Sequence, residues 1–128
     1  MSAPWGITNR PAVNTAATVS QAAPGAPYQN RLRALQASLS GTAAGIAELV
    51  VRDGATGVGA ILMSLDVACP VDGVAIVQLS GLDFRSSPGN ALTVEFVAAG
   101  GANTQQDVNA QGDLIVPGQS YGSNPSGN

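Results

Sequence analysis

The sequence predicts an all-β fold: a two-sheet antiparallel sandwich of the jelly-roll kind, with an extended N-terminal arm and a flexible C-terminal tail. Three observations support this prediction. Apolar and polar residues alternate along several short segments, as in strands with one buried face. Clusters of Gly, Pro, Asn and Asp separate these segments at intervals of roughly 8–12 residues. The length of 128 residues suits a single domain with one core. We therefore divide the chain into an arm (1–27), a sandwich domain (28–117) and a Gly/Ser-rich tail (118–128).

The N-terminal arm differs in composition from the rest of the chain. It holds Pro at positions 4, 11, 24 and 27, which excludes a long helix and favours extended backbone. Residues 13–20 could pair as an edge strand. Trp5, the sole tryptophan, is a residue type favoured as an anchor in protein interfaces. Two interpretations stay open: a loose leader, or an arm that lies on a neighbouring subunit.

The next segments read as strands in turn. Residues 28–40 fit a short helix through Leu32, Leu35 and Leu39, but they alternate equally well as a strand, and the strands that follow favour the strand. Residues 46–53 form a β-branched strand that ends in an Asp-Gly turn. Residues 58–67 are its hairpin partner, so that Gly54, Gly57 and Gly59 belong to a hairpin loop.

The second half continues the pattern. A Pro-x-Asp-Gly turn over 70–73 precedes a strand over 74–79. In the strand over 92–98 the large apolar residues share one face, with Phe96 in the core, while Thr93 and Glu95 lie on the polar face. Residues 104–116 supply one or two strands, broken near 111–113. The tail is low in complexity and is expected to be mobile.

Charge is scarce in this chain and limits its partners. Only 10% of residues are charged, the net charge is −3, and the positive charges are five arginines without any Lys or His. A nucleic-acid partner needs clustered positive charge, and Arg31 and Arg33 are the only local pair, which we interpret as a solvated or partner-facing strand edge. No segment has the length of a membrane span, and the first ten residues do not resemble a secretory signal. Cys69, the single cysteine, is expected to be a buried thiol at a strand end, consistent with synthesis in a reducing cytosol.

The sequence offers no set of catalytic residues. Without His, neither Ser-His-Asp nor Cys-His catalysis nor a His-ligated metal is available. Without Lys, a P-loop and a Schiff base are excluded. Of the carboxylates only Glu48 and Glu95 lie in mid-strand, and we interpret both as solvated strand positions. We therefore predict a non-enzymatic protein that has no cofactor and no metal.

One passage resembles a known class of protein. The runs SGLDFR (80–85), GNALTVEF (89–96) and AAGGANT (98–104) resemble small β-sandwich accessory virion proteins of tailed bacteriophages. The resemblance covers about residues 46–112 and carries no catalytic residues. It implies a structural role, most directly a capsid decoration or cement protein, made in the bacterial host cytoplasm and located in the virion.

The resemblance also implies partners. These are copies of the same chain, with a trimer expected first, and a major capsid or tail protein lattice. From the charge and the lack of a long apolar segment, we expect no nucleic acid and no membrane as partners. The candidate interface residues are Trp5, Ile7, Arg10, Tyr28 and Tyr121. Two other interpretations remain open: a subunit of the tail, collar or fibre base, and a carbohydrate-binding adhesion module. The few aromatic residues, 4% of the chain, argue against an aromatic sugar platform.

Overall fold

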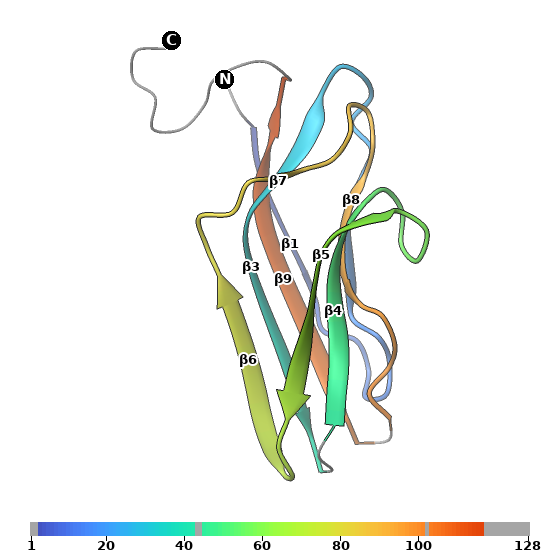
Figure 1. The fold of residues 1–128 in the computed structure, drawn as a ribbon, viewed down its shortest axis with the longest axis vertical. Coiled ribbons are helices and arrows are strands. Elements are labelled where there is room, and N and C mark those ends of the chain that lie inside the picture. The colour runs from blue at the N-terminus through green and yellow to red at the C-terminus, as the bar shows by residue number, and fades with distance from the viewer. Residues whose placement is uncertain (1–2, 43–44, 102, 117–128) are drawn as a thin grey trace.

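The computed structural model of the chain describes residues 3–42, 45–101 and 103–116. Within these ranges the chain forms nine strands and no helix, so no described segment is a helix that could span a membrane. The strands build two antiparallel sheets that pack face to face as an elongated sandwich (Figure 1). The predicted all-β sandwich is therefore confirmed.

The order of the strands in the two sheets is that of a jelly roll. The first sheet has the order β1-β9-β3-β6, with the short β7 also paired to β3. Its strands are β1 (Ala3–Asn9), β9 (Gln105–Ile115), β3 (Gln29–Gly41), β6 (Gly73–Leu79) and β7 (Phe84–Arg85). The second sheet has the order β2-β8-β4-β5. Its strands are β2 (Thr18–Gln21), β8 (Leu92–Phe96), β4 (Gly45–Asp53) and β5 (Ala60–Cys69). The chain thus crosses repeatedly from one sheet to the other.

The core lies between the sheets and is built from the inward-facing residues of the inner strands. Phe96 is 1% exposed, which confirms its prediction as a core residue. Gln106 is polar yet fully buried in this layer. Its side chain accepts a hydrogen bond from the Ala17 amide and donates one to the Ala98 carbonyl oxygen, each at 2.9 Å. Because both ends of the side-chain amide are hydrogen-bonded, burying Gln106 carries little free-energy cost.

Most predicted strands match the structure to within a few residues. The ambiguous segment 28–40 is a strand, β3, and the strands predicted over 46–53, 58–67, 74–79 and 92–98 are β4, β5, β6 and β8. The glycine-containing loop lies between β4 and β5 as expected. Residues 105–115 form one continuous strand without the predicted break. Cys69 is buried at the end of β5, also as predicted.

The N-terminal segment corrects the predicted division of the chain. Residues 3–9 are extended, as expected, but they form β1 and pair in register with β9 of the same chain. Residues 18–21 form β2 and pair with β8. The segment 1–27 therefore supplies an edge strand to each sheet instead of forming an arm outside the sandwich. The tail over 118–128 lies outside the described residues.

Candidate assembly surface

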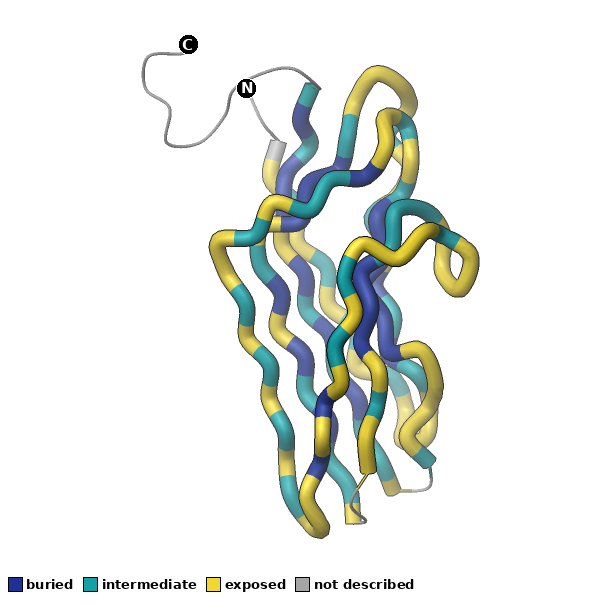
Figure 2. Tube along the Cα trace, viewed as in Figure 1, coloured by how far each residue is buried: buried dark blue, intermediate teal, exposed yellow. Residues whose placement is uncertain are grey.

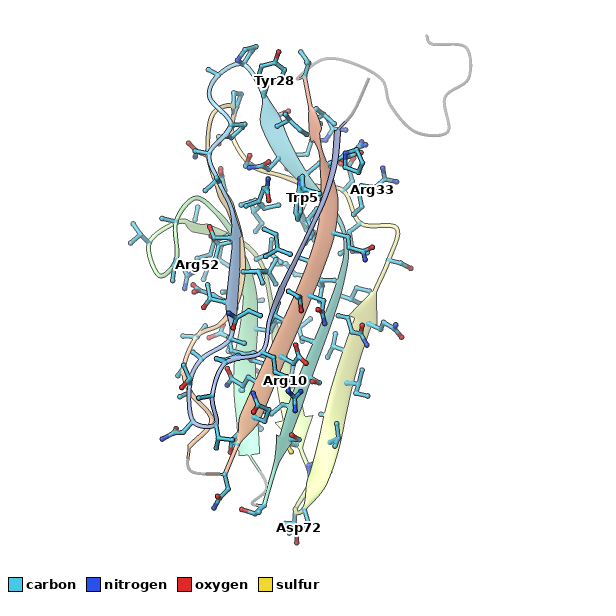
Figure 3. The ribbon with its side chains drawn as sticks, turned by 180° about the vertical axis from the view of Figure 1, so that it is seen from behind. Trp5, Arg10, Tyr28, Arg33, Arg52 and Asp72 are labelled. Carbon is cyan, nitrogen blue, oxygen red and sulfur yellow. The ribbon has the colours of Figure 1, made fainter. Side chains whose placement is uncertain are left out.

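The predicted interface residues do not come together at one place. Trp5 and Ile7 point inward from β1 and pack against the core cluster. Arg10 follows β1, is exposed, and forms an ion pair with Asp107 at 3.1 Å. Tyr28, 43% exposed, lies at the far end of the molecule from Arg10 (Figure 3). Tyr121 lies outside the described residues.

Trp5 packs at a specific position in the sandwich. It lies directly opposite Gly112 of β9. A Cβ at Gly112 would come within 2.5 Å of Cζ2 of the indole ring and would overlap the backbone carbonyl oxygen of Arg31. The missing side chain therefore makes the space in which the ring lies against β9. The indole Nε1 is buried and has no hydrogen-bond partner among the described residues.

A different surface, along β5 and β6, has the features of an interface. Each of these strands is the last of its sheet, so each leaves one side without a strand partner. Large apolar side chains are exposed along both strands and in the turn between them. We call this the edge surface and define it by Ile61, Leu62, Val71, Val74 and Ile76, which are 37–64% exposed. Figure 2 shows exposed residues alternating along β6 and dominating the hairpin turn.

The core is also incompletely covered on this side. The inward-facing residues of the inner strands are buried to 3% exposure or less, for example Leu35 on β3 and Val94 on β8. Several inward-facing residues of β5 and β6 pack against the same core but are only partly buried: Met63, Leu65, Ala75, Val77 and Leu79. Nearer the turn, Val67 and Cys69 of β5 are buried. A partner seated on this side would therefore cover apolar surface from both faces of the edge strands.

The edge of β6 lacks the features that usually prevent pairing between sheets. Natural edge strands are protected by charges, prolines, bulges or a covering segment. The sequence of β6, GVAIVQL, contains neither a charge nor a proline, and its register with β3 runs without a bulge. The position of this strand was predicted correctly, but its exposure at a sheet edge was not. Its signal was the run of apolar residues at the exposed positions, Val74 and Ile76.

All five arginines are paired with carboxylates. Arg10, Arg33 and Arg85 form exposed or half-exposed pairs, of which Arg33 to Asp113 is the longest at 3.9 Å. Arg31 is 5% exposed and makes two hydrogen bonds of 2.8 Å to Asp113. This burial corrects the interpretation of Arg31 as a solvated edge residue. Since every guanidinium lies near a carboxylate, the arginines do not form an uncompensated cationic patch for phosphate.

The second buried pair holds a loop. Arg52 donates to Glu95 at 2.6 Å and to the Gly59 carbonyl oxygen at 3.1 Å. Glu95 also accepts the Gly57 amide at 2.9 Å, so the β4–β5 loop folds back over the outer face of the second sheet. Glu95 is 4% exposed as a result, which corrects its predicted solvated position. Glu48 on β4 is exposed, as predicted.

Two aspartates have a lowered pKa. Burial alone would raise the pKa of Asp53, but hydrogen bonds from the side chain and amide of Ser87 and from Asn90 outweigh it and lower the pKa below 3.8. The Arg85 side chain lowers the pKa of Asp83 by a hydrogen bond that outweighs burial. Both carboxylates tie loops to strands. Among the described residues no three His, Cys, Asp or Glu side chains gather in a possible metal site.

Comparisons with known proteins identify no family for this chain. No protein-family model matches the chain, and no curated protein sequence matches it. A chain of the naturally occurring empty particles of cowpea mosaic virus is 12% identical, with a TM-score of 0.46 over 95% of this chain and 92% of that one. The mitogen of Yersinia pseudotuberculosis is 14% identical, with a TM-score of 0.40 over 96% and 93%. The tobacco streak virus coat protein is 6% identical, with a TM-score of 0.39 over 95% and 93%.

Proposed function

We propose that this chain is a non-enzymatic structural protein of a virus particle that assembles through its edge surface with further copies of itself. The observation that carries the proposal is the unprotected β6 edge with Val74 and Ile76 exposed beside it. Pairing of β6 with a strand of another copy would satisfy its free backbone groups and partly cover both side chains with those of the added strand. The scarcity of surface charge supports the same function, because charge is the usual defence against association.

The fold is compatible with this function but does not select it. Jelly rolls occur in capsid proteins and also in lectins and cupins, so function has to be argued from the surface. The described residues offer paired arginines, loop-anchoring aspartates and no metal cluster. These features are more typical of a rigid structural subunit than of a catalytic site.

Within this class we propose a decoration or cement protein of a bacteriophage capsid, with a tail, collar or fibre-base subunit as the related alternative. The resemblance of residues 46–112 to phage accessory proteins supports this narrower proposal. A closed homo-oligomer, with a trimer tested first, would use the edge surface between copies. Arg10 and Tyr28, both exposed, are the described candidates for contact with the underlying shell.

The test replaces apolar edge residues by lysine. We expect the purified wild-type chain to form a defined oligomer in analytical ultracentrifugation. The double variant Val74→Lys/Ile76→Lys should be monomeric, because lysines at a sheet edge oppose pairing. Val58→Lys is the matched control: Val58 is 84% exposed but lies in the β4–β5 loop, so this variant should assemble like wild type.

The shell contact needs a second measurement. Capsids of a tailed phage that lack their decoration protein would be mixed with the purified chain and pelleted. We expect co-sedimentation of wild type and reduced co-sedimentation of Arg10→Glu/Tyr28→Ala. A wild-type chain that is monomeric at all concentrations, or a lysine double variant that assembles normally, would contradict the proposed assembly. Failure to bind any particle would contradict only the decoration role.

A further inference from the structure

The outer face of the first sheet carries a row of uncharged polar side chains across all four of its main strands. Thr8 lies opposite Asn109, Asn109 opposite Gln36, and Gln36 opposite Gln78. The hydroxyl of Thr8 donates to the side-chain oxygen of Asn109. This face is turned toward the viewer in Figure 3. No member of the row carries a charge.

A groove of about 310 Å³ takes in three members of this row, Gln36, Gln78 and Asn109. The rest of its lining is polar at Gln111 and Ser80 and apolar at Ala34, Leu35 and Leu79. Ala34 lies opposite Gln111, and its small side chain leaves room on the floor between the longer amides. The volume is at the lower end of small-molecule sites, which span roughly 300–1,000 Å³. The groove is therefore large enough for a small ligand.

Three of the side-chain amides in the groove are free, whereas the side-chain oxygen of Asn109 already accepts a hydrogen bond from Thr8. Among the described residues, the side chains of Gln36, Gln78 and Gln111 make no hydrogen bond to the protein. Each side-chain amide offers two donors and an acceptor, and each sugar hydroxyl both donates and accepts. An ionic ligand would find no opposite charge in the lining. An apolar ligand would cover the amides without replacing their hydrogen bonds to water, which is unfavourable for each group left unpaired.

We propose that this groove binds a neutral saccharide through the amides of Gln36, Gln78 and Gln111. The chemistry points to an uncharged sugar unit of a glycan, held by hydrogen bonds without aromatic stacking. Such a site would give the particle contact with a glycosylated surface. The inference does not rest on the assembly proposed above, because the groove belongs to the single chain.

The test follows the side-chain NH₂ signals of the ¹⁵N-labelled full chain by NMR. The probes are the methyl glycosides of glucose, galactose and mannose, with N-acetylneuraminic acid as the charged comparator. Glycerol controls for non-specific polyol effects, and a Gly-Ser peptide represents an extended-chain ligand. We expect saturable shifts of the groove amides with at least one neutral glycoside, at a Kd in the millimolar range, about −4 kcal/mol.

Three variants make the result specific. Gln36→Ala should raise the Kd about two- to tenfold, the effect of one lost neutral hydrogen bond. Ala34→Leu should abolish binding by filling the floor while leaving every amide in place. Ser40→Ala, on the same strand and outside the groove lining, should leave the Kd unchanged. The absence of saturable shifts, equal shifts with glycerol, undiminished binding to Ala34→Leu, or binding of the peptide alone would each overturn the proposal.

Discussion

The buried pair Arg52–Glu95 gives the sharpest prediction for stability. The two side chains are 11% and 5% exposed, with 2.6 Å between Nε and Oε2. Glu95→Ala removes the partner of a nearly buried guanidinium and leaves the Gly57 amide without its acceptor. Breaking a buried ion pair from one side costs about 3–5 kcal/mol, because the remaining charge is uncompensated. We therefore expect the free energy of unfolding to fall by about that amount.

Urea unfolding at neutral pH, followed by fluorescence of Trp5, measures this loss through the midpoint at constant slope. The control is the double variant Arg52→Met/Glu95→Leu, which removes both charges at once. Since well-packed apolar replacements of a buried pair are often neutral, it should be more stable than Glu95→Ala. A Glu95→Ala variant within about 1 kcal/mol of wild type would refute the reasoning. So would a double variant as unstable as the sum of the single ones.

Two further variants test the core and the loops. Phe96→Ala should lower the free energy of unfolding by about 3–5 kcal/mol, because the ring fills the centre of the core; a loss below about 1 kcal/mol in urea unfolding would contradict the register of β8. Asp53→Asn tests the lowered pKa. Since the pKa of Asp53 is lower in the folded chain than its usual 3.8, its ionised form stabilises the fold above that pH, and this contribution disappears as pH falls through the folded pKa. The difference in unfolding free energy between wild type and Asp53→Asn should therefore be constant near neutral pH and shrink below about pH 4; a difference independent of pH would contradict this.

The strands were predictable because their signals are local. Alternation over 92–96 and the turn residues before it place β8 without knowledge of its neighbours. The sequence could not show that β8 is covered on both sides. Thr93 and Glu95 alternate as polar residues should on a solvated face, yet both are buried. The β4–β5 loop that covers Glu95 is about 40 residues away in the chain, and nothing in the local pattern reports such a contact.

The candidate surfaces were less predictable, because they depend on strand order. The apolar residues of β6 look in sequence like those of any buried strand. Val74 and Ile76 are candidates for an interface only because β6 is the last strand of its sheet. The amide groove has the same origin: Gln36, Gln78 and Asn109 are unremarkable until the register of three strands aligns them. The edge surface and the amide groove therefore depend on the order and register of the strands more than on the sequence of any single strand.

The N-terminal strand shows how a sound local inference can still misplace a residue. Four prolines in the first 27 residues correctly predict extended backbone, and an exposed Trp in an extended arm would suit an interface. The local pattern could not show the role of Gly112 on β9, which lies opposite Trp5. Because Gly112 has no side chain, the indole ring fits against β9 at this position. Because that place is filled from within the chain, the tryptophan is committed to the fold of its own subunit. At the opposite edge of the same sheet, β6 has an unprotected side, and this is the side proposed to bind a neighbour.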